Sequence, residues 1–301
     1  MTNLKNDCII NCDFDRVFAL NNCNMEYRIW DMASIRAFMS PFLWKTGGLM
    51  MKKTEFCESR GISAKELNNW ENTELQANYY KAYEKRYSQV YENNMLWSAK
   101  ENTPDVLECI KNYKINKKSK ILDLGCGEGR DAICLLNGGY NVIAVDYSHT
   151  VIEKCKELSN YKYNTSFKQF DLLNDKMNCK FDFIYSIAVL HMFVLDEHRN
   201  KFLSFIREHL KKEGICLICV LGDGKCEYVS NINEAFKDIK RTVMNNNTEL
   251  EIAATSCKIV NWEQLECEII KNNLKIEQKW ISNNIPEFDN SMCVVVKRGD
   301  L

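Results

Sequence analysis

The stretch that decides the fold of this chain is KILDLGCGEGRD, residues 120–131. An apolar run leads into three alternate glycines and then into a helical pattern. Such glycines let the backbone turn tightly and approach a ligand closely, while free N–H groups of the next helix point at that ligand. An acidic residue is expected about 20 residues later, at the end of a second strand. Asp146 supplies it after NVIAV, residues 141–145, so the pattern predicts a site for a nucleotide-like cofactor.

Residues 121–132, followed by VDYS at 145–148, resemble motifs I and II of the class I S-adenosylmethionine-dependent methyltransferases. The third glycine comes one residue earlier than in the Gly-x-Gly-x-x-Gly fingerprint of NAD enzymes, and Asp123 lies two residues before the first glycine. Two further motifs follow in family order, FKQFDL at 167–172 and FDFIYSIAVLH at 181–191. The resemblance extends over residues 90–300 and is to the small-molecule type, which includes tellurite- and thiol-type enzymes.

The resemblance implies S-adenosylmethionine as the cofactor. Asp123 would help hold its methionine end, Asp146 would accept hydrogen bonds from its ribose hydroxyls, and Asp171 would contact its adenine amine. Arg130 could pair with the cofactor carboxylate or lie at the surface, as arginines at helix starts often do. The expected cofactor-binding residues are Asp123, Gly125, Cys126, Gly127, Gly129, Arg130, Asp146, Tyr147, Asp171, Leu172 and Ile187.

His191 follows the fourth expected strand, at the carboxyl edge where open α/β sheets bind their ligands. A histidine's ordinary pKa near about 6.5 suits it to be a catalytic general base or a substrate-orienting group. The alternative is a packing role beside Met192 and Phe193, because methyl transfer mainly needs positioning and the exclusion of water.

The expected acceptor is a small molecule, methylated on an oxygen, nitrogen or sulfur atom by in-line displacement. The fourth strand lacks the Asn/Asp-Pro-Pro-aromatic signature of enzymes that methylate nucleic-acid amines, so an RNA acceptor, like a protein acceptor, is a minor alternative. A dehydrogenase is disfavoured by the glycine spacing and by the absence of a Tyr-x-x-x-Lys pair after that strand. A catalytically silent cofactor-binding partner or sensor stays open, because methyl transfer needs few dedicated side chains.

Strands alternate with helical patterns from Lys120 onward, which predicts an α/β fold: a Rossmann-like, mostly parallel sheet with helices on both faces. Helices are expected at 197–212 and at 262–272, the second with Asn261 as its N-cap. The resemblance implies that the last two strands form an antiparallel hairpin. The seven expected strands are 120–124, 141–146, 165–170, 181–187, 215–221, 274–281 and 292–297.

Residues 222–260 lack strand periodicity and are interpreted as an insertion after the fifth strand. They could contact the substrate, or form a solvated loop with a helix near 233–242. The insertion would belong to a methyltransferase domain at 96–301.

The first 95 residues are expected to form a helical extension or lid. An apolar stripe from Ile35 to Leu43 is interrupted by Pro41 and ended by the glycine pair at 47–48. A tyrosine then recurs every fourth residue from Tyr79 to Tyr91. These side chains share one helix face, which could pack on the core or close over the ligands. The candidate substrate or lid residues are Tyr87, Tyr91, Trp97 and His191.

Composition limits the partners. The 301 residues include 40 basic and 41 acidic ones, so no global field would steer the chain to nucleic acid or to an anionic membrane. The opening residues are polar and no run approaches about 18 apolar residues, so we expect a cytoplasmic protein without a membrane partner. Oligomeric state is left open.

The 15 cysteines are expected to be reduced thiols and no metal site is expected. Cys216 and Cys219 lie within an apolar strand, where a buried structural role is favoured over zinc. A soft metal at Cys8, Cys12 and Cys23 is a minor alternative, because no histidine or second cysteine pair accompanies them.

Overall fold

The computed structural model describes residues 83–97, 101–230, 256–285 and 288–299, and the backbone alone of 43–46, 49–52, 240–245 and 248–253. The chain divides into two compact units, one of residues 1–10 and 79–301 and the other of residues 11–78. The first unit contains the central sheet and the cavity described below. The described part of the second unit is a short hairpin.

Seven strands form the central sheet: β3 Lys120–Leu124, β4 Asn141–Asp146, β5 Phe167–Gln169, β6 Phe181–Ile187, β7 Leu210–Leu221, β12 Leu274–Ser282 and β13 Ser291–Arg298. Their spatial order is β12-β13-β7-β6-β3-β4-β5. Neighbouring strands from β7 to β5 run parallel, whereas β13 runs antiparallel to both β7 and β12. The predicted seven-stranded, mostly parallel sheet and its terminal hairpin are confirmed, although β5 is shorter than expected.

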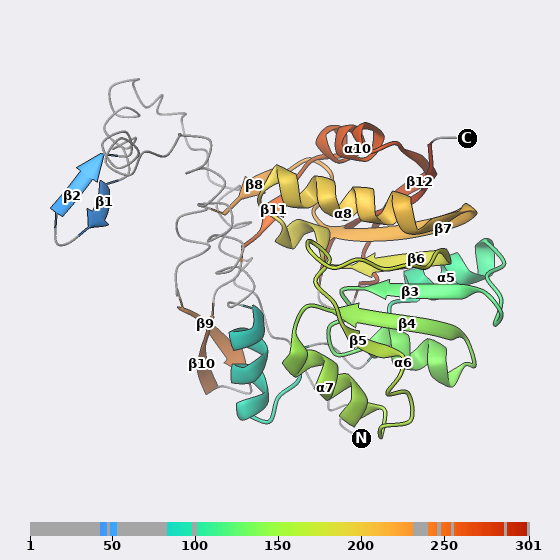
Figure 1. Ribbon diagram of the computed structural model, residues 1–301, viewed down its shortest axis with the longest axis horizontal. Coiled ribbons are helices and arrows are strands. Elements are labelled where there is room, and N and C mark those ends of the chain that lie inside the picture. Colours follow the sequence, from blue (N-terminus) through green and yellow to red (C-terminus); the bar gives the residue numbers. More distant parts are fainter. Residues whose placement is uncertain are drawn as a thin grey trace, which may run out of the picture. The chain divides into compact units, whose positions relative to one another are not determined.

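Helix α5 Pro104–Asn112 precedes β3, and the later helices are α6 Arg130–Asn137, α7 His149–Leu158, the 3₁₀ turn η2 Leu190–Met192, α8 Asp196–His209 and α10 Trp262–Lys271. In Figure 1, α8 and α10 lie by the β7 and β12 half of the sheet, and α6 and α7 lie by the β4 and β5 half. Asn261 caps α10 as predicted, because its Oδ1 accepts from the Gln264 N–H at 2.9 Å. In the described part of the chain, no helix is both long and apolar enough to cross a membrane.

The helix predicted at 197–212 ends earlier, at His209, and β7 begins at once with Leu210. The His209 ring stacks on Phe205 with a centroid distance of 3.9 Å, and its Nε2 lies 2.8 Å from the Met177 carbonyl oxygen. Leu210 pairs with Phe181 of β6, so the charged residues 211–213 extend the strand. Pairing across the sheet therefore overrides the helix propensity of these lysines and glutamate.

Residues 222–260 contain strands where none was expected. Two short pairs form, β8 Tyr228–Val229 with β11 Lys258–Ile259, and β9 Lys240–Asn245 with β10 Thr248–Ala253. The helix expected near 233–242 is wrong over 240–242, which belong to β9, and its earlier residues lie outside the described chain. The polar run at 245–248 joins two paired strands, and turn chemistry of this kind gives no strand signal to a periodicity search.

The helical interpretation of the N-terminal residues is also wrong in part. Strands β1 Leu43–Thr46 and β2 Leu49–Lys52 pair antiparallel around the glycines at 47 and 48. Two glycines between strands are a hairpin signal as well as a helix stop, and here the hairpin forms. The helix predicted for the tyrosine repeat is confirmed over residues 83–92, while the position of Tyr79 lies outside the described residues.

Buried thiols are part of the core. Cys216 and Cys219 are both buried in β7, which confirms their structural role, and Cys219 Sγ lies 3.0 Å from Cys293 Sγ of β13. All 11 cysteines among the described residues are free. No group of three or more potential metal-ligating side chains forms within the described part of the structure. Cys8, Cys12 and Cys23 lie outside it.

One buried side chain connects three elements on the β7 side of the sheet. Arg199 of α8 is 1% exposed. Its Nη2 donates to Glu268 Oε2 of α10 at 2.7 Å, and its Nη1 donates to the carbonyl oxygens of Leu190 at 2.9 Å and Phe193 at 3.3 Å. Because these carbonyls lie at either end of the η2 turn, Arg199 fixes the segment that follows β6.

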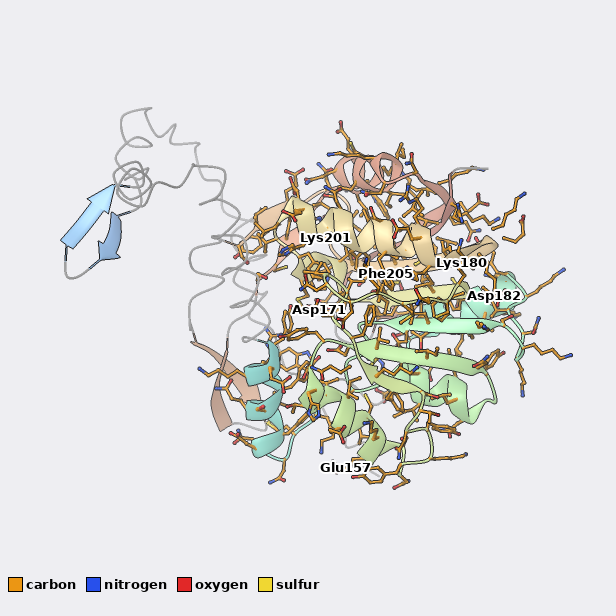
Figure 2. The ribbon with its side chains drawn as sticks, viewed as in Figure 1. Glu157, Asp171, Lys180, Asp182, Lys201 and Phe205 are labelled. Atoms are coloured by element: carbon orange, nitrogen blue, oxygen red, sulfur yellow. The ribbon has the colours of Figure 1, made fainter. Side chains whose placement is uncertain are left out.

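Replacing Arg199 with Met should lower the free energy of unfolding by about 3–5 kcal/mol, because Glu268 and two carbonyls lose a buried cationic donor. Urea denaturation monitored by circular dichroism measures this change. The matched control is Lys201→Met on the same helix, whose ion pair with Glu197 is exposed and should contribute within about 0.5 kcal/mol. Equal effects of the two substitutions would contradict the assigned role of Arg199; Figure 2 labels the control residue, Lys201.

Candidate functional site

A cavity opens at the carboxyl ends of β3, β4 and β6, where the strand order reverses on either side of β3. Ligands bind at this kind of switch point in open α/β sheets. The structure brings ten of the eleven expected cofactor residues into the cavity wall: Asp123, Gly125, Cys126, Gly127, Arg130, Asp146, Tyr147, Asp171, Leu172 and Ile187. Gly129 is the exception. It begins α6 with φ of +73°, and a Cβ there would lie 3.0 Å from both Cys155 Sγ and Phe167, so it serves packing.

The glycine loop is shaped by the end of β4. The N–H groups of Gly125 and Cys126 both donate to the Val145 carbonyl oxygen at 2.9 Å. Gly125 has φ of +81°, and a Cβ on it would lie 2.4 Å from Val189 Cγ2. Backbone conformation and lack of space therefore both require glycine here. The loop thus presents bare backbone to the cavity.

Asp146 joins the loop to the end of β4. One carboxylate oxygen accepts from the Gly127 N–H at 3.0 Å, and the other accepts from the Ser148 N–H at 3.0 Å. Burial raises the pKa of Asp146, and the N–H groups of Ser148 and Gly127 oppose that rise. The carboxylate is thereby held at the cavity wall with its charge only partly compensated.

Asp123 lies in β3, just before the loop, and is 4% exposed. Burial raises its pKa well above the ordinary value, and the neighbouring Asp131 raises it further. The Tyr185 hydroxyl next to it also has a raised pKa, mainly through burial, so the phenol stays protonated. The mutual influence of these two carboxyls marks a region that favours a cationic ligand group.

Asp171 lies beyond the end of β5, on the cavity side of the sheet, as Figure 2 shows. Its Oδ1 accepts from the Leu173 N–H at 2.9 Å and its Oδ2 accepts from Asn174 Nδ2 at 2.7 Å. These bonds fix the carboxylate within a turn. Apolar side chains of Tyr147 and Leu172 flank it in the cavity wall.

Sequence reasoning missed two acidic residues near the last glycine of the loop, Glu128 just before it and Asp131 in the first turn of α6. Glu128 Oε1 accepts from the Trp97 N–H at 2.7 Å, and Asp131 accepts from the Thr103 N–H at 2.6 Å and from its hydroxyl at 2.8 Å. Arg130 is half-buried in the cavity wall, where its Nη2 donates to the Thr103 hydroxyl at 2.8 Å. Acidic residues at the start of a helix are common, so the sequence alone does not distinguish these two. Only their long-range hydrogen bonds show that they hold residues 97 and 103 against the loop.

The helix of residues 83–92, drawn in teal in Figure 1, lies where the arrowheads of β3 and β4 point. Glu84 accepts from the Thr150 N–H at 3.2 Å and from its hydroxyl, which holds the helix to α7. Its residues Tyr83, Arg86 and Tyr87 line the cavity, as does Trp97, which follows it. Tyr91 is not in the wall but packs against Tyr87, with ring centroids 6.0 Å apart.

Tyr87 sits directly over the glycine loop. A Cβ on Gly127 would lie 3.5 Å from its hydroxyl oxygen. Burial raises the pKa of Tyr87 well above its ordinary value, and the charges of Asp146 and Glu128 raise it further. The phenol is therefore neutral and serves as a hydrogen-bonding group of the cavity.

His191 is not placed in the cavity wall. It is 3% exposed, and its Nδ1 accepts from the Leu221 N–H at 3.3 Å. Burial, then Arg199 and Arg86, lower the pKa of His191 to about 3, and its ring meets Phe288 edge-on at 5.8 Å. An imidazole with so low a pKa is a poor proton acceptor at neutral pH. This geometry favours the packing alternative over the general base.

The remaining wall comes from the segment after β6 and from Phe288. Ala188 has an unusual φ of +61°, and its N–H donates to the Cys219 carbonyl oxygen at 2.9 Å. The strained turn directs Val189 and Met192 into the cavity. Neither side chain carries chemistry that a sequence could reveal, because apolar residues after a strand are ordinary core candidates.

Asp123→Asn should raise the free energy of unfolding at pH 7 by about 1–2 kcal/mol, because the substitution removes a charge whose ionisation opposes folding. The gain should shrink as the pH falls from the raised pKa of the folded state toward the ordinary value, since wild-type Asp123 then takes up a proton on its own. Urea denaturation across this pH range measures both effects.

Asp182→Asn is the control of opposite sign. Burial acts to raise the pKa of the Asp182 carboxyl, but hydrogen bonds from the Lys211 ammonium and the Lys120 N–H lower this pKa overall. Its charge therefore stabilises the fold above the ordinary pKa, and its removal should decrease stability. A loss of stability in Asp123→Asn at pH 7 would contradict the interpretation of that carboxyl.

Comparison with known proteins places this geometry in a family context. The model of the family described as "Tellurite resistance protein TehB" matches residues 88–240, half of the chain. A "Probable S-adenosyl-L-methionine-dependent methyltransferase TehB" of Haemophilus influenzae is 33% identical over 108 residues. The match covers 35% of this chain and only 37% of that relative. A ubiquinone biosynthesis O-methyltransferase of Rickettsia typhi is 29% identical over 134 residues, which cover 42% of this chain and 51% of the relative.

Solved structures share the fold at low sequence identity. The CcbJ methyltransferase of Streptomyces caelestis superposes with a TM-score of 0.56 at 12% identity, covering 72% of this chain and 98% of its own. An S-adenosylmethionine-dependent methyltransferase of Clostridium acetobutylicum gives a TM-score of 0.51 at 19% identity, covering 65% and 90%. The family match begins within the helix that lines the cavity and includes every strand end that forms it. The chain belongs to the TehB family of tellurite resistance proteins.

Proposed function

We propose that this chain transfers a methyl group from S-adenosylmethionine to a small-molecule acceptor. The observation that carries the proposal is Asp146, held at the end of β4 by the glycine loop, facing one cavity with Asp123 and Asp171. The names of the curated relatives support the cofactor and the reaction class. Because the match spans little more than a third of the TehB relative, the activity of the whole chain is part of the proposal.

The residues in the wall fit this cofactor. The bare backbone of the loop permits close approach, and Asp146 offers carboxylate oxygens to ribose hydroxyls. Asp171, Tyr147 and Leu172 provide a carboxylate and apolar surface for an adenine ring. The buried carboxyl of Asp123 lies where the cationic methionine end would be held.

When bound, the cofactor supplies an electrophilic methyl group on a sulfonium. An acceptor lone pair would take that methyl group, and the electrons of the methyl–sulfur bond would stay on sulfur. The protein's task is to align the partners and exclude water. Tyr83, Tyr87 and Trp97 would act as a lid, because they cover the open ends of the strands with aromatic surface. Their anchor is the contact of Glu84 with Thr150 on α7.

No dedicated base is assigned. The described residues of the cavity wall include no histidine, lysine or glutamate, Tyr87 is held protonated, and the four aspartates lie in the part of the wall assigned to the cofactor. The proposed acceptor therefore carries a nucleophile that loses its proton to solvent. Thiols are suitable, because they ionise in water within about two units of neutral pH.

Calorimetric titration with S-adenosylmethionine, S-adenosylhomocysteine and NADH tests the cofactor class. We expect the two sulfur compounds alone to bind the wild type, and Asp146→Ala to weaken binding by about tenfold or more, as loss of a charge-assisted contact requires. Asp146→Asn preserves the side chain's shape and separates charge from packing. Asp182→Asn should bind normally, because Figure 2 places that residue at the far end of the sheet from Asp171.

Preference for NADH, or no binding by the folded wild type, would refute the proposed function. A screen for radiolabelled methyl transfer to small thiols, phenols and amines then addresses turnover. Cofactor binding without transfer to any acceptor would instead support the silent partner or sensor. The expected absence of nucleic-acid and membrane partners stays part of the proposal.

A further inference from the structure

The cavity wall has two chemically different parts. The ends of β3, β4 and β5 and the start of α6 contribute all four aspartates of the described wall, and the proposed function assigns this part to the cofactor. The other part comes from the helix of residues 83–92 and Trp97 after it, the turn after β6 and the segment before β13. Its neutral side chains are aromatic or apolar: Tyr83, Trp97, Val189, Met192, Phe193 and Phe288.

Arg86 is the one charged residue in this second part among the described lining residues. It is 3% exposed, and its guanidinium carbon lies 4.6 Å from the Trp97 ring centroid and 5.5 Å from that of Tyr83. The two rings fix the plane of the guanidinium and remove water from it. A cation held this way in an apolar wall interacts strongly with an anion that enters the cavity, because little solvent screens it.

A guanidinium matches one ligand chemistry especially well. Its five N–H donors form a planar fork, so Arg86 can keep its protein contacts and still bind a carboxylate through two parallel hydrogen bonds. The surrounding rings suit a flat, apolar body that carries this group. The nearby His191, which Arg86 helps to keep neutral, adds no competing positive charge.

We propose that Arg86 binds a carboxylate of the methyl acceptor, and that the acceptor is an aromatic or similarly flat acid whose nucleophilic atom faces the cofactor part of the cavity. The inference rests on the proposed function, because it assigns the second part of the wall to the acceptor. It makes Arg86 the residue that selects anionic acceptors over neutral ones of the same shape.

Two other roles for Arg86 give different results. A purely structural residue would hold Trp97 by stacking and would not distinguish charged from neutral ligands. A cofactor-binding residue would pair with the carboxylate of the methionine moiety, so its loss would weaken binding of S-adenosylhomocysteine itself. The test must therefore separate cofactor affinity from acceptor affinity.

The probes are benzoate and benzamide, which share shape but differ in charge, titrated by saturation-transfer NMR into protein saturated with S-adenosylhomocysteine. We expect benzoate to bind the wild type at least about tenfold more tightly than benzamide, and Arg86→Met to abolish that difference. Arg86→Lys keeps the charge without the fork and should retain part of the preference. Lys85→Met, an exposed neighbour on the same helix, is the matched control and should retain all of it.

Affinity for S-adenosylhomocysteine should be the same in all four proteins. A parallel loss of that affinity in Arg86→Met would assign Arg86 to the cofactor and overturn the inference. Equal binding of the two probes, or no binding of benzoate to the wild type, would overturn it as well. If the folded wild type does not bind S-adenosylhomocysteine at all, the proposed function itself fails. Thermal melting of each variant verifies folding, and Arg86→Lys carries the comparison if Arg86→Met unfolds.

Discussion

The site depends on one carboxylate that accepts two backbone hydrogen bonds. Asp146 connects the Gly127 N–H of the loop after β3 with the Ser148 N–H at the start of α7. Strand pairing aligns β3 and β4, but this carboxylate fixes the conformation of the loop between β3 and α6. The same oxygen atoms are the ones proposed to receive the ribose hydroxyls. Structural and proposed ligand-binding roles thus share one buried charge. Burial raises the pKa of Asp146, while the two N–H donors stabilise its ionised form.

Much of the sheet could be predicted from local signals. The run from Ile121 to Leu124 is mostly apolar and leads into the glycine loop, and Asp146 closes a second apolar run, so both strands and a ligand site at their ends follow from the sequence. Errors occurred where a distant partner decides the outcome. Leu210 is a strand residue because it pairs with Phe181, and residues 43–46 form a strand because they pair with residues 49–52. Neither partner is visible in a local window.

The part of the wall proposed for the cofactor was more predictable than the part proposed for the acceptor, for a related reason. A site built from backbone turns needs certain residue types at fixed distances along the sequence, as the glycines and Asp146 show. The acceptor part instead collects single side chains from remote segments, such as Arg86 and Phe288, with no shared spacing. His191 shows the converse limit: its position after β6 was correct, but only burial and the Leu221 N–H reveal a neutral, packed imidazole.

The hydrogen bonds that Trp97 and Thr103 donate to Glu128 and Asp131 have a kinetic meaning. Trp97 belongs to the cavity wall, and its backbone is tied to the residue that separates the second and third glycines. Any path that moves this wall aside must first break charge-assisted bonds to the same loop that is proposed to hold the cofactor. The residence time of a bound molecule is then set by the opening of the chain around it, and tight retention does not require many direct contacts with the molecule.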